Sequence, residues 1–192
     1  MGKDAIYAGA MLAIGLGLGG CGLGHQTPED AFRALQESIV ERDWRRTLNA
    51  MTPESRDKCV GSIVFAYQIA AIVDRESKAI LDRHGFDRAK LTGPAAEGQS
   101  QGGLLDSLKA NLDVERYANT VNDKHAFFAD VMNQEKGVAS EAGQRLQALA
   151  GATLGDVRIE GETATGRVKL AGGPGLPIYF RRQTGGWLID LF

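Results

Sequence analysis

The stretches VRIEGETATGRVKL (residues 157–170) and IYFRRQTGGWLIDLF (residues 178–192) decide the fold of this chain. In both, apolar and polar residues alternate, which is the period of a β-strand with one buried face. Each stretch is interrupted once by residues that favour a tight turn. The last forty residues therefore predict two successive β-hairpins, which together would form a four-stranded antiparallel sheet.

Gly161-Glu162 is the expected turn of the first hairpin. A two-residue turn there would place Ile159 opposite Ala164 and Val157 opposite Gly166. The residues expected on the apolar face are Val157, Ile159, Val168 and Leu170, and those on the polar face are Arg158, Glu160, Arg167 and Lys169.

Gly185-Gly186 is the expected turn of the second hairpin, because glycine accepts the positive φ angles of such turns. This turn would place Arg181 directly opposite Asp190. The residues expected on one face are Ile178, Phe180, Trp187, Ile189 and Leu191, and those on the other are Tyr179, Arg181, Leu188, Asp190 and Phe192.

Composition limits the classes of function. The 192 residues are 43% hydrophobic and 24% charged, which is ordinary for one globular domain. The net charge of −2 gives no basic excess, so we expect no nucleic-acid partner. Cys21 and Cys59 are too few for a disulfide framework and lack the neighbouring ligands of a zinc site, so neither a metal nor another cofactor is predicted.

The N-terminus reads as an export signal. Lys3 precedes an apolar run at residues 5–18 that is shorter than the roughly 20 residues of a membrane span. Leu18-Gly19-Gly20-Cys21 then resembles the lipobox of bacterial lipoproteins. That resemblance implies that residues 1–20 are removed, that Cys21 is acylated and anchors the chain to a membrane, and that residues 21–26 form a tether. A flexible glycine-rich tail, or a secretory signal with a chance cysteine, is the alternative.

Three helix starts follow the tether. Thr27, Asp43 and Thr52 are each suited to cap a helix, and proline follows both threonines at the first helical position. The apolar stripes expected on the first two helices are Phe32, Leu35, Ile39 and Val40, and then Trp44, Leu48 and Met51.

Four short motifs give the chain a resemblance to the NTF2-like domains of secreted bacterial lipoproteins. They are TPEDAFRAL (27–35), ERDW (41–44), LNAMTPES (48–55) and GWLIDL (186–191). The resemblance implies a single α+β domain over residues 27–192, in which N-terminal helices pack on a curved four-stranded antiparallel sheet to form a cone with an internal pocket.

The middle of the chain departs from that family, because residues 56–152 read as a helical insertion. A mobile linker is expected at about residues 92–103, where glycine, glutamine and serine are frequent. The helices expected around it are Asp57 to His84 with a glycine stop at Gly85, Leu104 to Leu112, Val114 to about Lys136, and Ser140 to Ala150. The apolar face expected on the first of these includes Ile72 and Val73. The inner stripe expected on the third is Tyr117, Val121, Phe128, Val131 and Met132.

Isomerases and dehydratases that share the NTF2-like fold use a carboxylate or histidine inside the cone. The possible pocket-lining residues here are Tyr67, Tyr117, Tyr179, Arg181 and Asp190. Arg181 and Asp190 would form a cross-strand ion pair, and a carboxylate held by a guanidinium is a poor general base near neutral pH. We therefore predict no catalytic residue.

Histidine and cysteine side chains have plain structural explanations. His25 and His125 are expected to be solvated, and His84 to stabilise the C-terminus of a helix. Cys59 lies on an apolar helix face and is expected to be a buried thiol.

Three functions remain open at this point. The leading one is an exported, membrane-anchored, non-catalytic binding or accessory module for a small apolar ligand or an envelope protein. Gly22 is not the aspartate that retains lipoproteins in the inner membrane of enteric bacteria, so the periplasmic side of an outer membrane is preferred. A small-molecule isomerase or dehydratase, and a purely structural envelope protein, are the alternatives; the latter predicts a cone filled by its own side chains.

Overall fold

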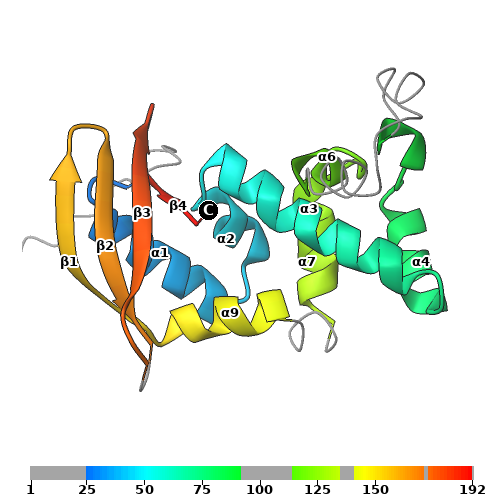
Figure 1. Cartoon of the computed structure of the whole chain (residues 1–192), viewed down its shortest axis with the longest axis horizontal. Helices are drawn as coiled ribbons and strands as arrows, with labels where there is room; N and C mark the ends of the chain where they lie inside the picture. Colours follow the sequence, from blue (N-terminus) through cyan, green and yellow to red (C-terminus); the bar gives the residue numbers. More distant parts are fainter. Residues whose placement is uncertain (1–24, 92–113, 135–140, 171–172, 192) are drawn as a thin grey trace, which may run out of the picture.

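The computed structural model describes residues 25–91, 114–134, 141–170 and 173–191. It is an α+β arrangement in which helices pack against an open four-stranded antiparallel sheet (Figure 1). The predicted features that lie outside the described residues are the signal at 1–20, the acylated Cys21, the linker at 92–103 and the helix at 104–112.

The sheet lies at one end of the long axis of the molecule, and α4 lies at the other (Figure 1). The helical elements are α1 (Pro28–Val40), α2 (Trp44–Asn49), α3 (Pro53–Ala70), α4 (Arg75–Arg83), the 3₁₀ helix η1 (Arg88–Leu91), α6 (Val114–Ala118), α7 (Lys124–Met132) and α9 (Glu141–Ala150). The strands are β1 (Thr153–Glu160), β2 (Thr163–Lys169), β3 (Leu176–Gln183) and β4 (Gly186–Asp190), paired in the order β1-β2-β3-β4.

All three predicted helix starts are confirmed. The side-chain oxygens of Thr27, Asp43 and Thr52 each accept a hydrogen bond from a backbone N–H three residues later, at 3.0–3.2 Å. Such caps satisfy donors that have no partner within the helix. The stripe on α1 is shorter than expected, because Val40 at its last position is 71% exposed.

The helix predicted from Asp57 to His84 is wrong as a single element. A turn at residues 71–74 divides it into α3 and α4, because the Asp74 carboxylate accepts hydrogen bonds from the first backbone N–H groups of α4. Ile72 and Val73, expected on the apolar face, lie in this turn and are exposed. The predicted glycine stop is confirmed, since Gly85 has φ +64° and the next residue's N–H bonds back to the Leu81 carbonyl at 2.9 Å.

The helix predicted from Val114 to about Lys136 is also two helices, α6 and α7. Asp123 caps α7 by accepting hydrogen bonds from the N–H groups of His125 and Ala126. The expected inner stripe is nonetheless buried: Tyr117, Val121, Phe128, Val131 and Met132.

The first hairpin has the predicted turn, and Ile159 pairs with Ala164. A β-bulge then changes the register, because Asp156 and Val157 together oppose Gly166. Asp156 takes φ +55°, a conformation that aspartate tolerates better than most residues. Since the bulge adds one residue, Leu154 turns to the same face as Val157, and both approach Gly166. Ile159, expected on the apolar face, is 55% exposed near the turn.

The second hairpin has the predicted faces but not the predicted register. Its two-residue turn is Thr184-Gly185, so Asp190 pairs with Tyr179 and not with Arg181. The shift is two residues, which leaves every side chain on its predicted face. Phe180 and Ile189 pair on the buried face.

The buried face of the sheet is filled by helix side chains. Phe32 and Leu35 of α1 are 3% and 0% exposed, and Phe180 in the middle of the sheet is 1% exposed. Gln36 fastens α1 to the end of α9 by donating from Nε2 to the carbonyls of Leu149 and Ala152, at 2.9 and 2.8 Å.

The outer edge of β4 is closed by two short segments. Backbone hydrogen bonds join His25 to Trp187 on one part of the edge. Next to it, Ile189 N–H donates to the Ala50 carbonyl and Thr52 N–H donates to the Ile189 carbonyl, each at 2.9 Å. These bonds satisfy backbone groups that an edge strand otherwise leaves open.

Candidate functional site

The five predicted pocket-lining residues do not converge on one pocket. Tyr67 and Tyr117 pack edge-on against Phe127 and Phe65 in the helical region, with ring centroids 6.1 and 5.2 Å apart. The other three, Tyr179, Arg181 and Asp190, lie together on the sheet face opposite Phe180.

Asp190 is held by hydrogen bonds on both carboxylate oxygens. Arg181 Nη2 donates to Oδ2 at 3.0 Å, and Ser55 Oγ donates to Oδ1 at 2.8 Å. Ser55 Oγ also accepts from the N–H of Leu191 at 3.0 Å, so it links the start of α3 to the end of β4. The ion pair is therefore as predicted, although it forms between diagonal neighbours. A carboxylate with two donors is positioned to hold structure together and has little freedom to accept a substrate proton.

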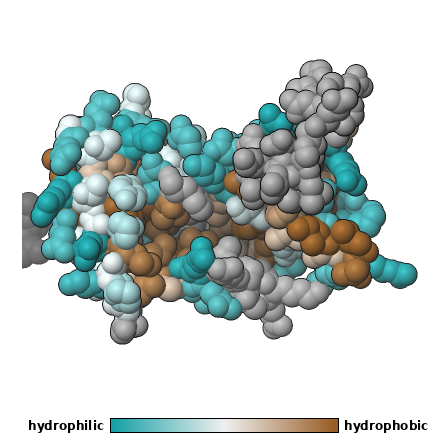
Figure 2. Space-filling model, in the orientation of Figure 1, coloured by the Kyte–Doolittle hydropathy of each residue, from teal (hydrophilic) through white to brown (hydrophobic). Residues whose placement is uncertain are grey.

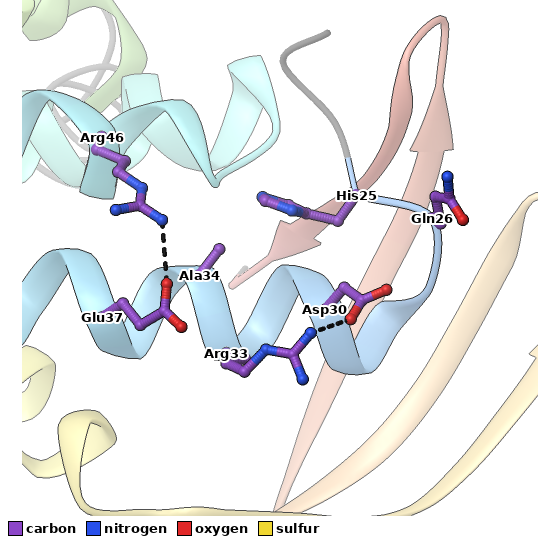
Figure 3. A pocket seen from close by; sticks show the side chains of 7 residues that line it. All are labelled: His25, Gln26, Asp30, Arg33, Ala34, Glu37 and Arg46. Carbon is purple, nitrogen blue, oxygen red and sulfur yellow. Dashed lines mark hydrogen bonds and ion pairs between the residues drawn. The ribbon is translucent and has the colours of Figure 1, made fainter. Parts of the chain in front are cut away.

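A polar concavity lies between α1, α2 and the segment at His25. It consists of two adjoining hollows of about 420 and 340 Å³, which share His25, Ala34 and Arg46. We call this surface the polar groove (Figure 3). The other residues that line it are Gln26, Asp30, Arg33, Glu37, Asp43, Arg45, Asn49 and Ala50.

Most charges of the polar groove are already paired. Arg46 bonds to Glu37 and Glu41 at 3.1 and 3.2 Å, and Arg33 pairs with Asp30 (Figure 3). The exposed Arg45 forms no side-chain hydrogen bond or ion pair within the described residues, although its positive charge contributes to lowering the pKa of Asp123 and of His125. Arg45 therefore supplies a guanidinium that is not held in an ion pair. By contrast, Asp30, Arg33, Glu37 and Arg46 of the polar groove are held in ion pairs.

His25 differs from its prediction as a solvated tether residue. Its backbone bonds to Trp187 in both directions, and its side chain projects into the polar groove (Figure 3). Partial burial lowers the pKa of His25, with opposing contributions from Asp30 and Arg46. The imidazole is therefore neutral at pH 7.

His125 is also more enclosed than predicted. Its Nε2 lies 2.9 Å from Asn49 Oδ1, and it is half-buried where α7 meets α2. Burial, and then the positive charge of Arg56, lower the pKa of His125.

His84 has the expected position and Cys59 the expected environment. His84 stands at the C-terminus of α4, but its ring bonds to Asp130 of α7 at 2.9 Å and packs edge-on against Phe127. Cys59 is a buried free thiol, and burial raises its pKa to about 12.

The described ranges contain neither a metal-binding cluster nor a membrane-spanning helix. No group of three or more histidine, cysteine or acidic side chains is arranged to hold a metal ion there. No helix in the same part of the chain is long and apolar enough to cross a bilayer.

The sequence interpretation missed the polar groove. One signal for it exists in the spacing of Asp30, Arg33 and Glu37, which places three charges along one face of a helix. The position of Arg46 and His25 beside that face depends on tertiary contacts and has no local signature.

Comparisons of this chain with family models, curated proteins and solved structures gave no match. The class that the fold defines is thus an α+β domain with an open, four-stranded antiparallel sheet covered by helices. The NTF2-like resemblance and the lipobox remain predictions from the sequence.

Proposed function

We propose that this chain is a lipoprotein of the cell envelope, acylated at Cys21, whose domain is NTF2-like and serves as a non-catalytic accessory module for a neighbouring envelope protein. The face of the sheet that would line the internal pocket is packed with Phe32, Leu35 and Phe180, all nearly or fully buried, which argues against a ligand inside the cone and is equally what a purely structural protein predicts. The observation that carries the proposal over that structural alternative is the polar groove, a concave surface on the outside of the domain.

An envelope protein is a better-supported partner than a small apolar ligand. Apolar ligands need hollows lined mainly by hydrophobic side chains, whereas the polar groove is lined mainly by charged and amide groups. A third hollow, at Glu162, Arg182, Gln183 and Thr184, is polar as well. Exposed Arg45 can pair with a carboxylate of a partner, and arginine is enriched at protein interfaces.

The isomerase or dehydratase alternative would need an accessible, unpaired acid or base. Asp190 is the carboxylate that the family resemblance suggests, and it is bonded to Arg181 and Ser55. This bonding favours the accessory role over the enzymatic one.

Photo-crosslinking in native membranes tests the proposed partner. A photoreactive residue at Gln26 in the polar groove is expected to give one protein adduct, and the same group at Thr165 on the exposed sheet face is expected to give none. Arg45→Glu should abolish the Gln26 adduct, while Arg45→Lys should retain it because the positive charge remains. Equal adducts from Gln26 and Thr165, or insensitivity to Arg45→Glu, would contradict a partner at the polar groove.

A further inference from the structure

Three large aliphatic side chains stand exposed where α3 turns into α4. Ile69, Ile72 and Val73 are 53%, 80% and 89% exposed. We call this group the aliphatic tip. Hydrophobic atoms gather at the α4 end of the molecule, away from the sheet (Figure 2).

The aliphatic tip belongs to a long uncharged stretch. No Asp, Glu, Lys or Arg occurs from Cys59 to Val73. The first charge after it, Asp74, is directed into α4, where it accepts from Ser77 Oγ at 2.6 Å and from backbone N–H groups. The next charged residues, Arg75 and Glu76, lie exposed at the start of α4, so Ile69, Ile72 and Val73 can enter an apolar environment to a depth that keeps those two side chains at the level of the headgroups.

The backbone N–H groups of the turn are also satisfied internally. Ala71 donates to the Tyr67 carbonyl at 2.8 Å, and Ile72 donates to the Ile69 carbonyl at 3.2 Å. Val73 and Asp74 both donate to the Ala70 carbonyl, at 3.0 and 2.8 Å. These four consecutive donors have partners within the chain, so their N–H groups add little to the cost of leaving water.

The size of the aliphatic tip favours a lipid surface over a protein partner. A specific protein interface of standard size buries roughly 800 Å² on each side, far more than three aliphatic side chains expose. Membrane insertion has no such threshold, because each buried side chain contributes separately. Side chains that project from a turn between two helices also suit penetration between headgroups better than docking against a flat face.

We propose that the aliphatic tip inserts into the boundary between headgroups and acyl chains of a lipid bilayer. This contact goes beyond the proposed anchor and rests on it in one respect, the orientation of the domain. His25 pairs with Trp187 of β4, in the sheet that lies at one end of the molecule (Figure 1), and the four residue steps from Cys21 to His25 span at most about 14 Å. With both ends on one bilayer, the long axis of the domain lies along the membrane.

A spin label at Val73→Cys tests the contact directly. Cys59 is buried with a raised pKa, so the new cysteine is the accessible thiol among the described residues. The full chain, purified from native membranes, is placed in protein-free phosphatidylcholine vesicles. Collision of the label with lipid-soluble oxygen and with a water-soluble nickel complex is then measured, with Thr165→Cys on the sheet as the matched control.

On going from protein in solution to protein on vesicles, we expect the ratio of oxygen to nickel collisions to rise severalfold for the label at Val73→Cys. The same ratio should stay constant for the label at Thr165→Cys. Ile72→Ser should reduce the inserted population by about tenfold or more, whereas Val40→Ser, at an exposed aliphatic residue of α1, should not. Added salt should leave the ratio unchanged, because the aliphatic tip carries no charge.

The opposite results each overturn the tip contact in a distinguishable way. If the chain stays on the vesicles and the ratio at Val73 is unchanged, the result would be consistent with the anchor at Cys21 and would contradict insertion of the aliphatic tip. Shielding of Val73 in solution that grows with protein concentration would assign the aliphatic tip to a second copy. Shielding only in native membranes would assign it to a protein, and a chain that leaves the vesicles would contradict both the tip contact and the anchor.

Discussion

The two ends of the molecule treat their apolar residues in opposite ways. At the sheet end, Phe180 and Leu35 are enclosed, and the outer edge of β4 is closed by hydrogen bonds to His25 and to residues 50–52. At the α4 end, Ile72 and Val73 are exposed although the backbone N–H groups of their turn are hydrogen-bonded. The sheet end therefore uses hydrophobic burial for stability, and the α4 end leaves hydrophobic surface free for another contact.

The largest expected effect comes from opening the sheet end. Phe180→Ala should lower the free energy of unfolding by about 3–5 kcal/mol, because it leaves a cavity in a packed core. Val73→Ala, which removes apolar atoms at the α4 end, should change it by less than about 0.5 kcal/mol. Chemical denaturation of both variants measures the difference. Similar losses of unfolding free energy in Phe180→Ala and Val73→Ala would show that the apolar residues at the two ends contribute equally to stability.

A somewhat smaller effect is expected where α3 crosses α6. A Cβ at Gly61 would lie 1.7 Å from the carbonyl oxygen of Val114, so Gly61→Ala must force the helices apart. We expect a loss of about 3 kcal/mol. Gly151→Ala is the matched control, since a Cβ there meets nothing within 4 Å, and it should be nearly neutral. Equal stability of the two variants would contradict the close crossing.

Next in size is the link between α3 and β4. Ser55→Ala removes the donor to Asp190 and the acceptor of the Leu191 N–H, and should cost about 1–2 kcal/mol. Ser62→Ala, at an exposed position of the same helix, should cost less than about 0.5 kcal/mol. Thermal unfolding monitored by circular dichroism compares them, and a neutral Ser55→Ala would show that Asp190 is not held through Ser55.

The smallest effect is a pH dependence located at the sheet end and at the junction of α2 with α7. Folding lowers the pKa of both His25 and His125, so the unfolded chain binds more protons than the native one below about pH 6.5. The free energy of unfolding should therefore be highest above that pH and fall as the pH drops below it. His125→Gln, which retains a donor for Asn49, should flatten this fall. A slope identical to that of the parent chain would exclude His125 as a contributor.

Local chemistry was sufficient to predict some features from sequence. Thr27 and Thr52, each followed by proline, start helices where expected. Alternation placed Phe180 and Ile189 on one shared face, which is the face that the structure buries. Those features depend on neighbours within a few residues.

Features that depend on competing local signals or on distant contacts were missed. Asp74 and Asp123 each begin a new helix inside a continuous apolar pattern, and the caps prevailed over the periodicity. The bulge opposite Gly166 and the polar groove around His25 arise from tertiary packing. Ile72 and Val73 were expected to be buried because a hydrophobic pattern alone cannot tell a core position from an exposed contact surface.

The measurement that tests the central claim most directly is the intact mass of the protein purified from its native membrane, beside a Cys21→Ala variant. The membrane-anchored account predicts the mass of residues 21–192 plus acyl chains, and a variant that is either released from the membrane or left unprocessed. A full-length, unacylated chain in the soluble fraction would contradict the account.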